Sequence, residues 1–173
     1  GMTDDETGEK AHLVFDENPK LDRLIELLEE LPDGRKAVVF YSFTRSGRSI
    51  VERLKQPDLG SMWLWSGTKD SRKELNRFYK DPKTRVAVVN SQLAAMSLDG
   101  LQDVANYMFF YESPVGVIDR AQAEKRLIRD GQKHKVFCYD ILVRKTVDEK
   151  VRYFHAAGDD LFAALMKNPG LLD

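Results

Sequence analysis

Ala37-Val38-Val39-Phe40-Tyr41 is the stretch of sequence that decides the fold of this chain. Its five residues are apolar without alternation, as expected of a strand that is buried on both faces of a parallel sheet. Similar apolar runs return at four later positions: 62–65, 86–89, 107–111 and 136–142. The sequence therefore predicts a mostly parallel sheet of at least five strands.

Helical patterns precede, separate and follow these runs. Asn18 can cap a first helix, Pro19 suits its first position, and Pro32-Asp33-Gly34 ends it. Its apolar residues recur at helical spacing: Leu21, Leu24, Ile25, Leu28 and Leu31. Further helices are expected at 46–54, 71–79 and 117–129, with two closing helices at 146–154 and 159–166. Strands that alternate with helices in this way predict an α/β fold with helices on both faces of the sheet.

The composition favours one folded domain. The 173 residues are 42% apolar and 32% charged with a net charge of -1, which excludes a disordered chain, and no apolar run is long enough for a membrane helix. A single cysteine, Cys138, excludes a disulfide framework and a cysteine-rich zinc site, so a reducing, cytoplasmic setting is expected. We interpret residues 1–11 as a tag remnant and disordered tail, and residues 12–173 as a single domain.

Polar residues follow each apolar run, at the place where the functional sites of such sheets lie. These strand ends read Ser42-Phe43-Thr44-Arg45, Ser66-Gly67-Thr68-Lys69, Asn90-Ser91-Gln92, Glu112-Ser113-Pro114 and Val143-Arg144-Lys145-Thr146. Hydroxyl groups, glycines and basic residues together suit phosphate binding, whereas the alternative is that the Ser and Thr residues simply cap helices. Because the net charge is near zero, contact with a phosphate backbone would need a local basic patch.

The segment from Gln122 to Gln132 reads Q-A-E-K-R-L-I-R-D-G-Q and is the most informative part of the sequence. On a helix, Gln122, Arg126 and Arg129 fall within an arc of roughly 60°. Two arginines one turn apart repel each other unless an anion lies between them, and their planar donors suit a phosphate. The alternative is a solvated face on which Asp119 or Glu124 pairs with the arginines.

The same segment resembles motif VI of superfamily 2 helicases, in the form Q-A-x-x-R-x-x-R-x-G-Q that Swi/Snf-type ATPases carry. Other segments resemble further elements of that family in the family's order. They are motif IV at 36–43, the segment D-G-S-T…R…F at 66–78, motif V at 88–101, the strand before motif VI at 106–114 and the ending V-x-x-Y-x-L…T-x-E at 135–150. The resemblance covers about residues 18–153, and the wording is most like the shorter bacterial and phage-borne members.

This resemblance implies a RecA-like three-layer α/β/α sandwich, the second of the two lobes of an ATP-dependent helicase or translocase. Arg126 and Arg129 would then be arginine-finger residues, while Gln122, Asp99 and Gly100 would contact the nucleotide. ATP with Mg²⁺ would bind together with an N-terminal lobe that carries the P-loop, and nucleic acid, expected to be DNA, would be the other partner. The residues expected to bind nucleic acid are Ser42, Thr44, Arg45, Gly67, Thr68, Lys69 and Ser91.

The chain departs from the family pattern in motif V. Where a glycine pair, a further glycine and an asparagine are usual, it has Ala94-Ala95, Ser97 and Asp99, with Gly100 as an insertion. Those glycines permit close approach of the backbone to nucleic acid or nucleotide, so the resemblance implies least about the function of this motif.

Two parts of a complete ATPase are absent from the sequence: a G-x-x-x-x-G-K-[ST] loop and an Asp-Glu box after a strand. We therefore expect the isolated chain to hydrolyse no ATP and to hold no cofactor by itself. An alternative function is an autonomous nucleic-acid- or protein-binding module without ATPase activity. A small-molecule α/β enzyme is disfavoured, because no G-x-G-x-x-G, nucleophile elbow or paired acid-base site occurs.

Several conspicuous residues are interpreted as structural. The three histidines share no metal-like spacing, so no metal site is expected. Cys138 lies in an apolar run and is expected to be buried rather than nucleophilic. Trp63 and Trp65 alternate on a strand, so one of them should face the core, with base stacking by Trp65 as the alternative. A monomer is expected, because the assigned core leaves no uninterrupted apolar helix face exposed.

Overall fold

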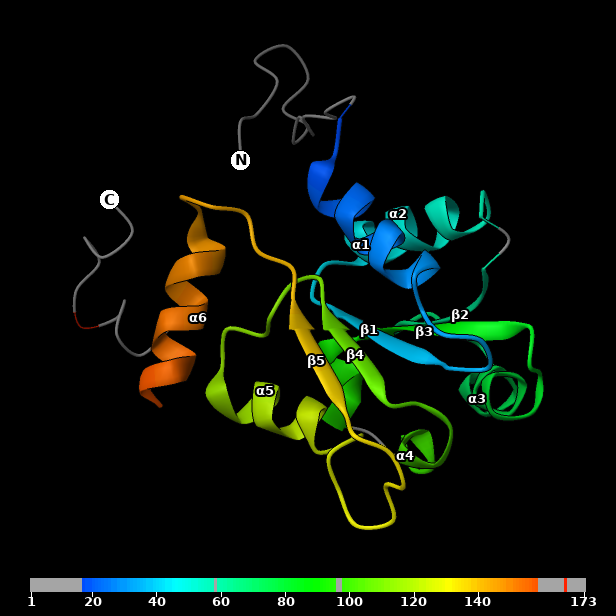
Figure 1. The fold of residues 1–173 in the computed structure, drawn as a ribbon. Coiled ribbons are helices and arrows are strands. Elements are labelled where there is room, and N and C mark those ends of the chain that lie inside the picture. Colours follow the sequence, from blue (N-terminus) through cyan, green and yellow to red (C-terminus); the bar gives the residue numbers. More distant parts are fainter. Residues whose placement is uncertain (1–16, 58, 96–97, 159–166, 168–173) are drawn as a thin grey trace.

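Among the described residues, five parallel strands form the centre of the computed structural model (Figure 1). The structure describes residues 17–57, 59–95, 98–158 and 167. In chain order the strands are β1 (Ala37–Tyr41), β2 (Gly60–Leu64), β3 (Thr84–Asn90), β4 (Tyr107–Phe110) and β5 (Phe137–Asp140). They lie side by side in the order β2-β3-β1-β4-β5, and every neighbouring pair is parallel. The prediction of a parallel sheet with at least five strands is confirmed.

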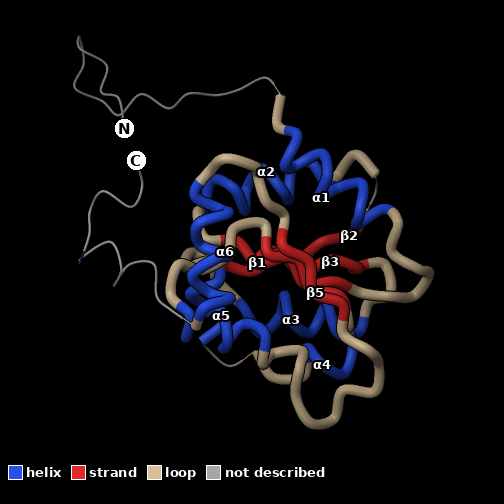
Figure 2. The backbone as a smooth tube through the Cα atoms, turned by 60° about the vertical axis from the view of Figure 1, so that its left-hand side comes forward, coloured by secondary structure: helices blue, strands red, loops and turns tan. Residues whose placement is uncertain are grey.

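Helices cover both faces of this sheet. Within the described ranges they are α1 (Pro19–Glu29), α2 (Thr44–Leu54), α3 (Ser71–Lys80), α4 (Leu101–Val104), α5 (Val117–Glu124) and α6 (Val147–Ala157), with one 3₁₀ helix, η1 (Ser91–Ala95). Figure 2 shows α1 and α2 on one face, and α3, α4 and α5 on the other. These three layers are the arrangement that the sequence predicts.

Burial on both faces explains the unbroken apolar run of β1, all five residues of which are buried. Val39 and Tyr41 belong to the core that α1 and α2 cover, whereas Val38 and Phe40 belong to the core under α3, α4 and α5. Each buried side chain of this size contributes about 1.5–3 kcal/mol relative to an exposed one. A polar residue at any β1 position would therefore disrupt one core or the other.

The start of α1 follows from local signals in the sequence. The Asn18 Oδ1 accepts a hydrogen bond from the Leu21 N–H at 3.0 Å, and Pro19 occupies the first helical position. The periodic apolar residues face the sheet, where Leu24 and Leu28 are fully buried. The predicted first helix is confirmed.

The helix expected over 117–129 is shorter in the structure, because α5 ends at Glu124. The chain continues in turns, in which the Arg126 N–H donates to the Ala123 carbonyl at 3.1 Å. These turns carry Leu127 into the core under α3, α4 and α5, where it is fully buried. Arg126 and Arg129 therefore do not lie on one helix face, and the predicted helical arc is wrong.

Cys138 is exposed, so the prediction that it is buried is wrong. The reason is that, among the described strands, β5 lies at an edge of the sheet and pairs with β4 alone. Desolvation by neighbouring side chains nevertheless raises the pKa of the Cys138 thiol to about 11. The thiol therefore stays protonated near neutral pH and is a poor nucleophile.

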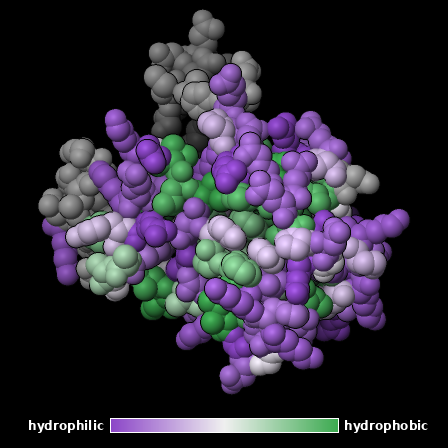
Figure 3. Space-filling view, in the orientation of Figure 1, coloured by the Kyte–Doolittle hydropathy of each residue, from purple (hydrophilic) through white to green (hydrophobic). Residues whose placement is uncertain are grey.

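The surface in the view of Figure 3 is mainly hydrophilic, with small apolar areas between polar side chains. No helix within the described residues is both long and apolar enough to cross a membrane. The tail at 1–11 and the closing helix expected at 159–166 lie outside the described residues.

Candidate functional site

At the carboxyl end of the sheet, the carboxylate of one residue, Glu112, joins the segment after β4 to the start of α2. Glu112 follows the end of β4, and its carboxylate accepts hydrogen bonds from the backbone N–H groups of Ser42 (2.9 Å) and Phe43 (3.0 Å). It also accepts a hydrogen bond from the hydroxyl of Ser46, in the first turn of α2. The N-cap residue Phe43 makes no side-chain cap, so a carboxylate from a different strand caps α2.

Four of the residues expected to contact nucleic acid are exposed at this end of the sheet: Gly67 and three with longer side chains, Thr44, Arg45 and Lys69. Thr44 and Arg45 begin α2, directly after β1. Lys69 lies in the turn between β2 and α3. The sheet edge therefore presents two cationic side chains and one hydroxyl to an incoming ligand.

Two other predicted residues use their hydroxyl groups within the fold. The Thr68 Oγ1 accepts a hydrogen bond from the Trp65 N–H at 3.0 Å. Ser91 is buried, and its hydroxyl donates to the Tyr41 carbonyl at 2.9 Å. These contacts fit the alternative weighed from the sequence, in which strand-end Ser and Thr residues serve local structure.

Gly67 allows the Trp65 ring to lie against the chain. A β-carbon at position 67 would come within 2.5 Å of that ring. The Trp65 ring also stacks on the Trp63 ring, with ring centroids 5.2 Å apart. Trp63 in turn packs against the core, which confirms that one of the two tryptophans faces inward. One face of the Trp65 ring is therefore occupied by Trp63 rather than by a base.

Arg126 and Arg129 converge on Asp99, just before α4. The Arg129 Nη1 lies 3.1 Å from the Asp99 Oδ1, and the Arg126 Nη1 lies 3.9 Å from the same oxygen. Gln122 lines an open pocket of about 480 Å³ together with both arginines. The structure thus brings the three predicted side chains to one place, through a turn rather than along a helix.

The charges around this pocket leave it suited to an anion. The Arg126 side chain is only 19% exposed, and its Nε has no hydrogen-bond partner among the described residues. The carboxylate of Asp99 is 72% exposed, and exposed ion pairs of this kind are weak. A buried N–H group without a partner is costly, so a ligand with acceptor oxygens would be stabilised here.

Two neighbours fix the backbone around Asp99. The hydroxyl of Tyr79 donates to the Asp99 carbonyl at 2.7 Å. Burial, together with the charges of Asp99 and Asp103, raises the pKa of Tyr79 to about 12, so this donor keeps its proton. Gly100 adopts a φ of 92°, a conformation that favours glycine. Gly100 therefore supplies a turn that leads from Asp99 into α4.

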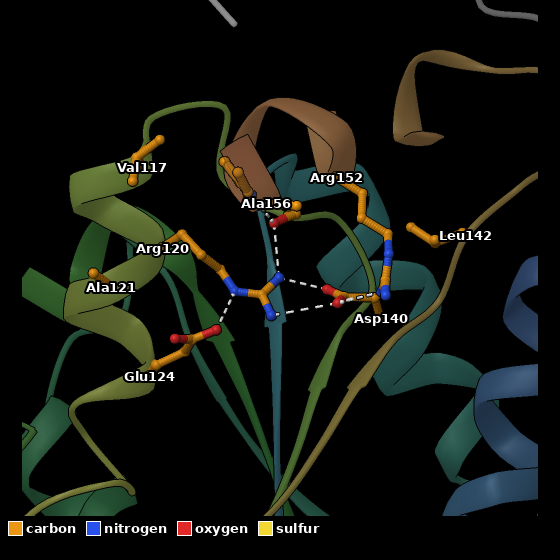
Figure 4. A pocket seen from close by; sticks show the side chains of 10 residues that line it. Val117, Arg120, Ala121, Glu124, Asp140, Leu142, Arg152 and Ala156 are labelled. Atoms are coloured by element: carbon orange, nitrogen blue, oxygen red, sulfur yellow. Dashed lines mark hydrogen bonds and ion pairs between the residues drawn. The ribbon is translucent and has the colours of Figure 1, made fainter. Parts of the chain in front are cut away.

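A second pocket, of about 290 Å³, lies between α5 and α6 (Figure 4). Arg120 on α5 points across it, forms an ion pair with Asp140 at the end of β5, and donates to Glu124 at 2.7 Å. Arg152 on α6 reaches the same Asp140 at 3.2 Å. Burial lowers the pKa of Arg120, but Asp140 and Glu124 outweigh this effect and raise it.

Sequence reasoning missed this ion-pair cluster. Glu124 was considered as a partner of Arg126 and Arg129, whereas it pairs with Arg120. The one available signal was the i,i+4 spacing of Arg120 and Glu124, which places them on neighbouring turns of a helix. Asp140 lies 20 residues from Arg120 in sequence, so only the sheet topology reveals it.

Comparisons with known proteins identify the similar chains. No family model matches. The chain is 26% identical over 139 residues to the chromatin-remodeling ATPase INO80 of Saccharomyces cerevisiae, which covers 79% of this chain and 9% of that protein. It is 27% identical over 152 residues to the ATP-dependent helicase fft3 of Schizosaccharomyces pombe, covering 86% of this chain and 16% of that helicase. The chain thus spans well under a fifth of the length of these curated relatives.

Solved structures agree in fold. The C-terminal part of the Fun30 ATPase domain matches with a TM-score of 0.73 and 22% identity, covering 83% of this chain and 48% of that one. The Escherichia coli DEAD-box protein SrmB, solved bound to RraA, matches with a TM-score of 0.57 and 17% identity, covering 70% and 68%. Both matches show a RecA-like fold, which confirms the predicted fold class.

The fungal origin of INO80 and fft3 gives no support to the expected bacterial or phage-borne kinship. The type of helicase that the sequence motifs indicate is supported, since these relatives are an ATPase and a helicase and the Fun30 match is to the C-terminal part of an ATPase domain. In sequence and in fold, this chain is therefore similar to the C-terminal lobe of Swi/Snf-type superfamily 2 helicases.

Proposed function

We propose that this chain is the second motor lobe of an ATP-dependent nucleic-acid helicase or translocase, with Arg126 and Arg129 as its arginine-finger residues. The observation that carries this proposal is the convergence of both guanidinium groups and Gln122 on one open pocket. The similarity in sequence to an ATPase and a helicase, and in fold to the C-terminal part of the Fun30 ATPase domain, supports it.

The residues of the pocket fit a nucleotide phosphate. Within the part of the chain that the structure describes, the buried Arg126 Nε has no hydrogen-bond partner, and Arg129 forms an ion pair with the exposed carboxylate of Asp99. ATP and Mg²⁺ would bind to an N-terminal lobe. Both guanidinium groups would then contact the γ-phosphate of ATP across the cleft between the lobes. Donors placed in advance stabilise the charge that develops on the transferred phosphoryl group, and an arginine finger is worth about 10³ to 10⁵ in rate. Gln122 would orient the pair or touch the nucleotide, with Asp99 and Gly100 beside it.

The carboxyl end of the sheet would hold nucleic acid, for which we propose DNA. Thr44, Arg45 and Lys69 are exposed there and would contact the phosphates of one strand. The backbone around Ser42, Gly67, Thr68 and Ser91 would shape the surface from which these side chains project. Closure of the two lobes on ATP would then move this lobe along its track.

The test is ATP turnover in the natural protein that carries both lobes. Replacing Arg126 or Arg129 with Ala should reduce turnover by about 10³-fold or more, because each removes a guanidinium from the transition state. Binding of ATP should stay largely intact, since the first lobe provides most of its contacts. The isolated chain should show no turnover, with or without DNA.

Arg23→Ala is the matched control, because Arg23 is a half-exposed arginine on α1 that pairs with its helix neighbour Glu26. Its turnover should equal that of the unmodified protein. Normal turnover without Arg126 and Arg129 would overturn the proposal and leave the autonomous binding module as the better explanation.

A further inference from the structure

Glu112 joins two regions to which the proposed function gives different tasks. On one side its carboxylate accepts hydrogen bonds from the backbone N–H groups of Ser42 and Phe43 and from the hydroxyl of Ser46. These groups lie at the end of the sheet that would hold nucleic acid. On the other side it stands in the segment between β4 and α5, and α5 leads directly into the turn of Arg126 and Arg129.

The Glu112 carboxylate is held by several hydrogen bonds at once. Two backbone N–H groups and one hydroxyl share the two oxygens of one half-buried carboxylate, an arrangement in which charge-assisted hydrogen bonds are strong. No acidic residue lies in the first turn of α2, so Glu112 is the anion that offsets the positive end of this helix. The position of the loop before α2 therefore depends on the position of Glu112.

The same carboxylate excludes a competing ligand. A phosphate that approached the N–H groups of Ser42 and Phe43 would meet a negative charge already hydrogen-bonded to them. Nucleic acid would instead contact the outward side chains of Thr44 and Arg45, which are exposed. Any movement of this loop on binding must then be shared with Glu112.

A continuous set of contacts runs from Glu112 to the arginine turn. The next residue, Ser113, accepts a hydrogen bond from the Arg120 Nη1 at 2.9 Å. Arg120 lies on α5, where it also binds Glu124, the last residue of that helix. Arg126 follows two residues later, hydrogen-bonded through its backbone to Ala123.

Building on the proposed function, we infer that Glu112 is a positioning residue that couples occupation of the nucleic-acid surface to placement of Arg126 and Arg129. It touches neither ligand. Its role is to transmit a shift of the loop at 42–43 and the first turn of α2 to α5, so that nucleic acid stimulates ATP hydrolysis.

The experiment uses the natural two-lobe protein and compares ATP turnover without DNA, with a DNA duplex and with a single-stranded oligonucleotide. Glu112→Gln keeps the size of the side chain but removes its charge, and should leave turnover without DNA unchanged. The maximal stimulation at saturating DNA should fall by at least about fivefold, the lower range of a typical coupling between sites. The DNA concentration for half-maximal stimulation should change little.

Glu74→Gln is the control, because Glu74 is a partly exposed carboxylate that pairs with Arg77 on α3, far from these contacts in sequence. DNA should stimulate ATP turnover of this variant as strongly as that of the unmodified protein. Ser46→Ala removes only one of the three donors and provides a milder second variant, with a smaller loss of maximal stimulation, should Glu112→Gln fold poorly.

The outcomes separate this inference from the proposed function. Normal maximal stimulation of Glu112→Gln at a higher DNA concentration would mean that Glu112 shapes only binding, and would overturn the coupling. An equal fall in turnover with and without DNA would reveal a structural cap alone and would also overturn it. If DNA fails to stimulate even the unmodified protein, the proposed function itself fails and takes this inference with it.

Discussion

Gly47 shows at the scale of one residue how tightly the carboxyl end of the sheet is packed. A β-carbon at this position of α2 would come within 2.4 Å of the ring of Tyr41. That ring is fully buried, and its hydroxyl both donates to the Leu64 carbonyl and accepts from the Trp63 Nε1. The ring therefore cannot move aside without losing hydrogen bonds.

Replacing Gly47 with Ala should accordingly destabilise the chain by about 1–2 kcal/mol, because overpacking a core costs more than alanine gains over glycine in a helix. Urea denaturation of the isolated chain measures this change. Ser49→Ala on the same helix is the control and should stay within about 0.5 kcal/mol of the unmodified chain. Equal stability of the Gly47 variant would contradict the packing against Tyr41.

Single residues differ in how far the sequence can foretell their roles. The spacing of Gln122, Arg126 and Arg129 indicates a shared direction, and the structure does bring them to one pocket. Their partner Asp99 lies 30 residues from Arg129, so no local pattern could pair the two. The partners of a charged group depend on tertiary contacts that periodicity does not encode.

The same distinction holds for whole elements. The start of α1 is predicted correctly, because Asn18 and Pro19 act on the backbone beside them. The end of α5 is not, because burial of Leu127 in the core draws the chain out of the helix after Glu124. Periodicity alone does not distinguish an apolar residue that continues a helix from one that packs beyond its end.

The ion-pair cluster that links α5, β5 and α6 leads to a prediction about stability. Asp140 pairs with Arg120 and Arg152, and the Arg120 guanidinium carbon lies 3.5 Å from the centre of the Phe110 ring. Asp140→Asn should leave the buried charge of Arg120 without its main counter-ion and lower the stability by about 3 kcal/mol, the low end for a broken buried ion pair.

Thermal and urea denaturation would measure this loss. Asp22→Asn is the matched control, because Asp22 forms an ion pair with Arg53 that is roughly half exposed and should contribute less than about 1 kcal/mol. If the Asp140 variant proved as stable as this control, the cluster would hold α6 only weakly.

At the scale of the whole molecule, the strand order places the functional regions next to each other. β1 and β4 pair at the centre of the sheet, so the residues that follow them meet, and Glu112 reaches the loop at Ser42. The apolar runs predict that these strands exist. Their order depends on how the crossover helices pack, which is why the link through Glu112 emerges only from the structure.

The charge of the whole chain leads to a prediction for nucleic-acid binding. The net charge is -1, so no general positive field attracts a polyanion, and Arg45 and Lys69 are the two exposed cations among the predicted contact residues. Two phosphate contacts release few counterions, so binding of duplex DNA by the isolated chain should be weak, with a log–log salt slope of about -2.

Fluorescence anisotropy with labelled duplexes of different sequence, measured over a range of salt concentrations, would test this. Arg45→Ala or Lys69→Ala should weaken binding evenly across sequences and reduce the magnitude of the slope by about 1, because each side chain contacts a phosphate and reads no base. Arg23→Ala, which changes the charge equally at a position on α1 outside the predicted contact residues, should leave the slope unchanged. Tight binding that persists at high salt would instead require contacts other than phosphate pairs, and would place the nucleic-acid surface elsewhere on the molecule.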